Sequence, residues 1–103
     1  MNKSDAMAVA PDLHAIIFEN DVVRILKVTV PKNAHADMHW HPANMNYVIK
    51  GGSLRFGKKD GTFTDMALEA GQVTSAETDV WHSVDNIGSS EVQTIQVEFK
   101  NLG

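Results

Sequence analysis

Histidines are the side chains in this sequence whose spacing best suits chemistry. His39 and His41 are separated by one residue, and residues two apart in a β-strand project from the same face. Two imidazoles side by side are a common start of a metal site. The pair alone is weak evidence, because an ordinary polar strand face could also carry it.

A third histidine far along the chain strengthens the metal interpretation. His82 follows Trp81 in a β-favouring segment. If that segment lies beside the one that holds His39 and His41, three neutral imidazoles can surround one divalent ion. The alternative is a half-buried His82 bonded to the backbone. His14 and His35 lack such company, so we expect His14 on the surface of a strand and His35 in a loop.

The composition limits both the ligands and the partners. There is no cysteine, so any metal must be held by nitrogen and oxygen atoms. The formal net charge is −4, and the nine Lys and Arg residues are spread without a basic stripe. We therefore expect no nucleic-acid partner. The apolar runs are too short for a membrane span or a signal peptide, so we expect a cytoplasmic protein with no membrane partner.

Short β-favouring segments separated by turn residues make up most of the chain, and none shows a sustained helical period. Gly51 and Gly52 together predict a hairpin. Evenly spaced short strands with glycine turns predict an all-β, antiparallel barrel or sandwich. The expected strands are residues 13–18, 22–30, 38–41, 45–50, 53–56, 62–68, 72–75, 80–84 and 91–99.

The chain has the length of one ordinary domain, 103 residues. Residues 1–12 are mostly small or polar and contain Pro11, which predicts a flexible N-terminal arm. We expect residues 13–103 to form a single domain.

The region around the histidine pair resembles the first motif of the cupin family. That motif runs Gly, five residues, His-x-His, three or four residues, Glu, six residues, Gly. Here Asn33 occupies the position of the first glycine, and His39 and His41 follow at the family spacing. The replacement is mild, because asparagine is one of the few residues that tolerate a left-handed backbone conformation.

The region around His82 resembles the second cupin motif, which runs Gly, five residues, Pro-x-Gly, two residues, His, three residues, Asn. Gly71, His82 and Asn86 fall at the matching positions, whereas Glu77 and Asp79 replace the proline and the glycine. The two motifs occur in the family order, and the resemblance covers about residues 20–100.

The resemblance implies a double-stranded β-helix, or jelly-roll barrel, with His39, His41 and His82 as metal ligands. One departure concerns the site directly. Asn44 stands where the family has a glutamate ligand, so the carboxylate is missing. Asn46 shares its face, and we expect Asn44, Asn46 and Val48 to contact a ligand inside the barrel.

Three imidazoles without a carboxylate suit iron, zinc or nickel, whereas manganese fits them less well. Such an ion keeps open positions for a small-molecule ligand. The resemblance implies an enzyme acting on a small organic acid or dicarbonyl, of the three-histidine iron dioxygenase or isomerase type. A non-catalytic small-molecule binding or sensing module is the alternative. No catalytic residue can be named, because no general base shares the inward faces.

Two tryptophans flank the histidine motifs and point away from them. Trp40 and Trp81 alternate with His41 and His82, so they face the outside of the barrel. They either cover its outer surface or contribute to an interface. Cupins of the type that the sequence resembles commonly pair through strand edges, so we expect a homodimer.

Overall fold

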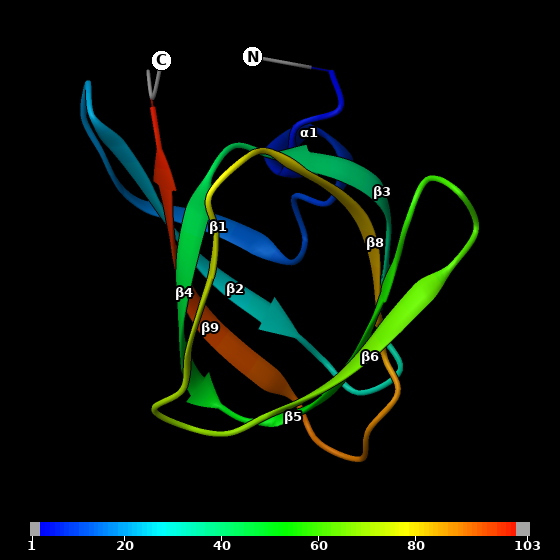
Figure 1. Ribbon diagram of the computed structural model, residues 1–103. Coiled ribbons are helices and arrows are strands. Elements are labelled where there is room, and N and C mark those ends of the chain that lie inside the picture. Colours follow the sequence, from blue (N-terminus) through cyan, green and yellow to red (C-terminus); the bar gives the residue numbers. More distant parts are fainter. Residues whose placement is uncertain (1–2, 101–103) are drawn as a thin grey trace.

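The structure is a computed structural model that describes residues 3–100. Two β-sheets face each other and enclose a barrel, and one short helix lies at an end of it (Figure 1). The expected all-β fold is confirmed. No helix among residues 3–100 is long and apolar enough to span a membrane. The elements are α1 (Ala6–Val9), β1 (His14–Glu19), β2 (Val23–Val30), β3 (His35–His41), β4 (Asn44–Lys50), β5 (Gly52–Gly57), β6 (Phe63–Leu68), β7 (Val73–Ala76), β8 (Val80–Asn86) and β9 (Val92–Phe99).

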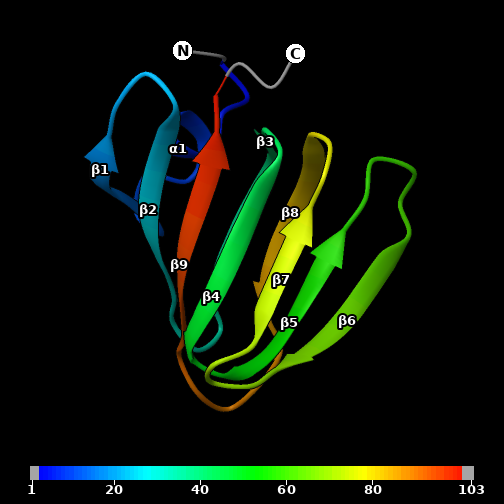
Figure 2. The ribbon, with the colours of Figure 1, turned by 60° about the vertical axis from the view of Figure 1, so that its left-hand side comes forward.

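The strand order is that of an antiparallel jelly roll. The larger sheet has the order β1-β2-β9-β4-β7, and the smaller has the order β3-β8-β5-β6. Figure 2 shows β2, β9 and β4 of the larger sheet running side by side. Every strand predicted from the sequence corresponds to one of these strands, with bounds that differ by a few residues. The chain also takes the left-handed conformation expected at Asn33, where φ is 67°.

An irregularity in β3 directs the histidine pair into the barrel. Ala36 pairs with Val84 and His39 pairs with His82, so β3 uses one residue more than β8 over this stretch. This extra residue is a β-bulge, and it shifts the alternation of the side chains. As a result Ala36, His39 and His41 are all buried on the inner face.

The expected hairpin at Gly51 and Gly52 is wrong. β4 pairs with β7 and β9, whereas β5 pairs with β6 and β8. The two glycines therefore form a corner at which the chain crosses from one sheet to the other. A Cβ atom on Gly51 would lie 2.2 Å from the backbone oxygen of Leu68, so this close approach of two backbone segments requires glycine.

The described residues of the N-terminal arm are packed against the barrel, and the flexibility expected of this arm stays a prediction. Asp5 and Ala6 are buried. Asp5 caps α1 by accepting a hydrogen bond of 3.0 Å from the backbone N–H of Met7. The backbone N–H of Trp40 donates a hydrogen bond of 2.6 Å to the carbonyl oxygen of Ser4. These hydrogen bonds stabilise α1, which has four residues and is too short to be a stable helix on its own.

The corner at Gly51 generates a prediction about stability. Replacing Gly51 by alanine forces two backbone segments apart, and we expect the free energy of unfolding to fall by roughly 1–3 kcal/mol. Urea denaturation measures this change. Lys50→Ala in the same corner is the matched control, because Lys50 is exposed and its loss should change stability by less than about 0.5 kcal/mol. Equal effects of the two substitutions would contradict the close approach.

Candidate metal centre

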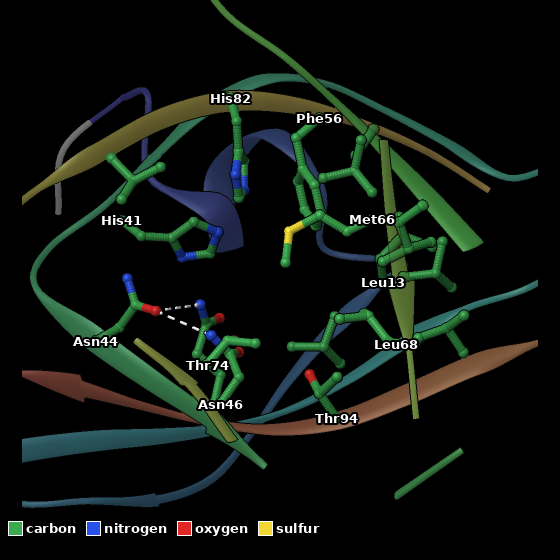
Figure 3. Close-up of a pocket in the computed structure, with 18 of the residues that line it drawn as sticks. Leu13, His41, Asn44, Asn46, Phe56, Met66, Leu68, Thr74, His82 and Thr94 are labelled. Carbon is green, nitrogen blue, oxygen red and sulfur yellow. Dashed lines mark hydrogen bonds between the residues drawn. The ribbon is translucent and has the colours of Figure 1, made fainter. Parts of the chain in front are cut away.

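A cavity of about 270 Å³ lies between the two sheets. Its lining is divided, as Figure 3 shows: His41, His82 and Asn44 lie toward one side, and Leu13 and Leu68 toward the other. Polar side chains therefore gather at one end of a cavity whose lining is otherwise largely apolar.

The structure brings the three predicted histidine rings together. The ring centroids of His39 and His41 lie 4.8 Å apart, and those of His39 and His82 also lie 4.8 Å apart. The centroids of His41 and His82 are separated by 5.1 Å. These rings come from β3 and β8, which are neighbours in the smaller sheet. Their role as ligands remains a prediction.

His14 joins this cluster, contrary to its expected place at the surface. Its ring centroid lies 5.5 Å from those of both His39 and His41, and ring nitrogens of these three residues all lie within 4.8 Å of one another. His14 is buried because it pairs with Val28 on the inner face of β2, beside the packed N-terminal segment. The sequence offered no local signal for this position. Its partners come from distant segments.

His35, which we expected in a loop, is instead the first residue of β3. It is exposed, and its two ring nitrogens lie 2.7 Å from a carboxylate oxygen of Asp85 and 2.9 Å from one of Asp37. These carboxylates raise the pKa of His35. It lies outside the histidine cluster.

Backbone carbonyl groups fix the orientation of two rings. The Nδ1 atom of His14 lies 2.9 Å from the carbonyl oxygen of Ala10, and that of His39 lies 2.7 Å from the carbonyl oxygen of Asp37. A carbonyl oxygen only accepts hydrogen bonds, so in both rings Nδ1 carries the proton. Nε2 of each ring therefore keeps its lone pair for another partner.

A carboxylate fixes the third ring. Nδ1 of His41 lies 2.6 Å from Oε2 of Glu98, and in the neutral tautomer that donates this hydrogen bond Nε2 also keeps a lone pair. Glu98 is in turn held by Arg24, whose Nε donates to Oε1 of Glu98 over 2.7 Å. Arg24 also donates to both carboxylate oxygens of Asp5, over 3.1 and 2.8 Å. All four residues are buried. No local pattern in the sequence marks Glu98, Arg24 or Asp5 as functional residues.

The cluster is electrically suited to a cation. Within residues 3–100, Nε2 of His39 is buried without a hydrogen-bond partner, which is costly unless something binds there. Burial lowers the pKa of His39 to about 4 and that of His82 to about 2. In His82 the positive charges that His41 and His39 would carry add to this effect. Both rings are thus neutral at pH 7, the form that binds metals.

Asn44, Asn46 and Val48 line the cavity, and their contact with a ligand stays a prediction. Oδ1 of Asn44 accepts hydrogen bonds from the amide groups of Asn46 and Gln96, over 3.0 and 3.3 Å. Its own amide donates to the carbonyl oxygen of Pro42 over 2.8 Å. With two donors already bound, this oxygen has no lone pair left for an ion. Asn44 is therefore part of a polar wall and does not replace the missing glutamate ligand.

The cavity lining, within the described part of the chain, contains no Asp, Glu, Lys or Arg. Apart from the histidines, no lining side chain can act as a general acid or base near neutral pH. The site can therefore bind and orient a small molecule, but proton transfer by the protein would have to use an imidazole.

Trp40 and Trp81 do not line the cavity, in agreement with their expected outward direction. They are cross-strand partners on β3 and β8 and are only half-exposed. Nε1 of Trp40 donates to Asp79 over 3.0 Å, and Nζ of Lys59 lies 3.4 Å from the centre of the Trp81 ring. These contacts favour the interpretation as cover of the outer surface.

The lowered pKa values predict a pH dependence for the metal-free protein. An unfolded chain binds protons at its histidines below about pH 6.5, whereas folded His39 and His82 resist protonation down to about 4 and 2. The contribution of these two histidines to the free energy of unfolding should therefore be fully present above pH 6.5. It should fall as the pH drops, by at most about 1.4 kcal/mol per pH unit for each histidine. Urea denaturation between pH 7.5 and 5 in EDTA measures this slope. His82→Gln should flatten it, and an unchanged slope would contradict the prediction.

Comparisons with known proteins agree with this geometry. Residues 26–98 match the family described as "Cupin domain", whereas no curated protein matches the sequence significantly. A cupin domain from Bordetella pertussis is 19% identical, with a TM-score of 0.77, over 84% of this chain and 91% of that one. An RmlC-like cupin family protein with a double-stranded β-helix fold from Methanocaldococcus jannaschii is 16% identical, with a TM-score of 0.68, over 84% of this chain and 78% of that one.

A third solved structure, from Klebsiella pneumoniae, is described as a conserved protein with a double-stranded β-helix domain. It is 20% identical, with a TM-score of 0.67, over 87% of this chain and 78% of that one. At these identities the structures are evidence for the fold, and the match of the family to residues 26–98 covers well over half of the sequence. The chain belongs to the cupin family.

Proposed function

We propose that the protein holds a divalent metal ion between His39, His41 and His82, and that His14 contributes a fourth imidazole. The observation that carries the proposal is the set of fixed rings. His14, His39 and His41 have Nδ1 bound to an oxygen acceptor, which leaves Nε2 for the ion, and ring nitrogens of these three lie within 4.8 Å of one another. Metal-bound histidines are held in this way by a partner on the other ring nitrogen. The ring centroid of His82 lies 4.8 Å from that of His39 and 5.1 Å from that of His41.

The number of imidazoles bears on the choice of metal. Four ligands would complete the tetrahedral site that zinc prefers and leave no position for a substrate. Iron and nickel accept more ligands, so they keep open positions beside four imidazoles. The proposed set therefore favours iron or nickel. Zinc would suit an arrangement in which one of the four histidines does not bind.

The cavity supports a small chelating molecule as the ligand. When bound, the ion would polarise a carbonyl or carboxylate group of a small organic acid or dicarbonyl. The apolar end, which includes Leu13 and Leu68, would hold the carbon skeleton and exclude water. Asn46 and Gln96 of the polar wall would orient polar groups beside the ion.

The absence of acid and base side chains from the described lining bears on the reaction. We propose oxygenase-type chemistry, which the ion and a chelating substrate can support without a protein base. An isomerase-type reaction would need one of the histidines to move the proton. The same absence also favours a second candidate, a non-catalytic module that binds or senses the small molecule.

Metal content tests the site. Protein purified without an affinity tag should retain about one iron or nickel ion per chain by inductively coupled plasma spectrometry. His82→Ala and His39→Ala should lose it while the barrel stays folded, because too few ligands remain. His14→Ala should weaken retention. His35→Ala is the control, since His35 is exposed outside the cluster. A His82→Ala protein that retains stoichiometric metal would show that another histidine is the third ligand.

Oxygen consumption distinguishes the two candidate functions. The iron-loaded protein is mixed with a small 1,3-dicarbonyl or a small 2-oxo acid while oxygen uptake and ligand binding are recorded. Oxygen uptake by the wild type that is lost in His39→Ala supports the enzymatic function. Binding of these molecules without uptake or conversion favours the binding module.

We further propose that the protein forms a homodimer through the outer face of the larger sheet. Alternation along β4 points every second residue outward, and the strand next to it carries another exposed apolar residue. The side chains concerned are Met45, Tyr47, Ile49 and Val73, which are 39%, 52%, 40% and 55% exposed. Grouped apolar exposure of this kind is typical of interaction surfaces. This face differs from the half-exposed tryptophans considered from the sequence.

Light scattering at micromolar concentration should show a dimer, and Tyr47→Lys should shift it toward a monomer because a charge is buried poorly at an apolar interface. Ile87→Lys is the control, since Ile87 is a similarly exposed apolar residue elsewhere, 44% exposed. A wild-type monomer at high micromolar concentration would contradict the proposal.

A further inference from the structure

We infer that Glu98 supplies the negative charge that the ligand set lacks, that it acts through His41 as a positioning residue, and that Arg24 and Asp5 hold it in place. This inference rests on the proposed metal site and adds the group that makes an all-imidazole site favourable for a cation.

The contact between Glu98 and His41 has the geometry that the role requires. Oε2 of Glu98 accepts a hydrogen bond of 2.6 Å from Nδ1 of His41, and each residue is only 1% exposed. A carboxylate in this position fixes the ring, keeps the proton on Nδ1 and makes Nε2 a stronger donor to an ion. In His14 and His39, by contrast, Nδ1 donates its hydrogen bond to a neutral carbonyl oxygen.

The position of Glu98 relates it to the missing ligand. On β4, Asn44 stands at the position of the family's glutamate, and the register of β4 and β9 pairs Asn44 directly with Glu98. Both side chains are buried. A carboxylate thus lies one strand away from the position of the family's glutamate, within the same sheet and against the ring of His41.

The surrounding charges favour a bound cation. Arg24 donates to Glu98 over 2.7 Å and to Asp5 over 2.8 and 3.1 Å, so two carboxylates share one guanidinium group. When His41 is neutral, the form that binds a metal, this buried group carries an excess negative charge, and an uncompensated buried charge is costly. An ion on the adjacent histidines would offset it.

The N-terminal segment takes part through two separate contacts. Asp5, which caps α1, holds Arg24 and through it Glu98. At the other end of the same segment, the carbonyl oxygen of Ala10 accepts the hydrogen bond from His14. Residues 5–10 therefore help to position His14 and His41, which come from β1 and β3.

The first test compares the cobalt affinity of the wild-type protein and Glu98→Gln, measured by competition with a chelator. Affinity should fall about ten- to a hundredfold, as for other groups that orient metal ligands. Glu69→Gln, at an exposed position in a turn, should leave it unchanged. A Glu98→Gln protein that keeps wild-type cobalt affinity would overturn the inference.

Rescue separates this role from a merely structural one. Asn44→Glu places a carboxylate on the neighbouring strand beside the histidines, and in the Glu98→Gln protein it should restore most of the cobalt affinity. A purely structural defect would lower the melting temperature of the metal-free protein and would not be rescued in this way. The absence of rescue, together with a large loss of metal-free stability, would overturn the inference.

A second variant keeps the test valid if Glu98→Gln does not fold. Asp5→Asn preserves the cap of α1, because asparagine is an equally good capping residue, but it removes the excess negative charge. Cobalt affinity should fall in the same direction, by less. If the wild type binds no cobalt, iron or nickel, the proposed metal site fails. If it binds metal and both variants retain wild-type affinity, the metal site stands and the role of Glu98 is overturned.

Discussion

The central constraint in this barrel is that polar side chains buried between two sheets must find hydrogen-bond partners. His41, Glu98, Arg24 and Asp5 satisfy it as one chain of contacts that runs from β3 across the larger sheet to the N-terminal segment. This chain fixes a ring, pins the helix cap to the barrel and keeps two buried carboxylates next to a cationic group. Removing Arg24 would leave the carboxylates of Asp5 and Glu98 buried without a cationic partner, so the arrangement of this end of the barrel depends on it.

The other end of the barrel obeys a simpler rule. Val30, Val48, Leu54 and Val92 form part of an apolar cluster whose burial supplies most of the driving force for closing the two sheets. Along β9 the buried residues change from Val92 through Thr94 and Gln96 to Glu98, so the interior passes gradually from apolar to charged. A cavity between these ends is suited to a small molecule with a polar head and an apolar body, which is the basis of the proposed function.

Much of the fold could be predicted from the sequence because its signals are local. Alternation and turn residues located the nine strands of residues 3–100 within a few residues. The motifs placed at position 33 a residue that tolerates the left-handed conformation found there, and they indicated that His39 and His82 lie close together. The hairpin at Gly51 failed for a physical reason. Two glycines predict a sharp change of direction, but whether the next strand returns beside β4 or crosses to the other sheet depends on which partners those strands find.

The sequence by itself determined the elements and the three histidines of the motifs, since strand period and local spacing fix which side chains share a face. Only the tertiary structure decided that the polar face of β9 turns inward, that the bulge in β3 aims His39 and His41 at the cavity, and that His14 and Glu98 join them. Strand pairing sets these positions. Glu98 lies 57 residues from His41 and Arg24 lies 74 from Glu98, and no local pattern records a contact between segments so far apart.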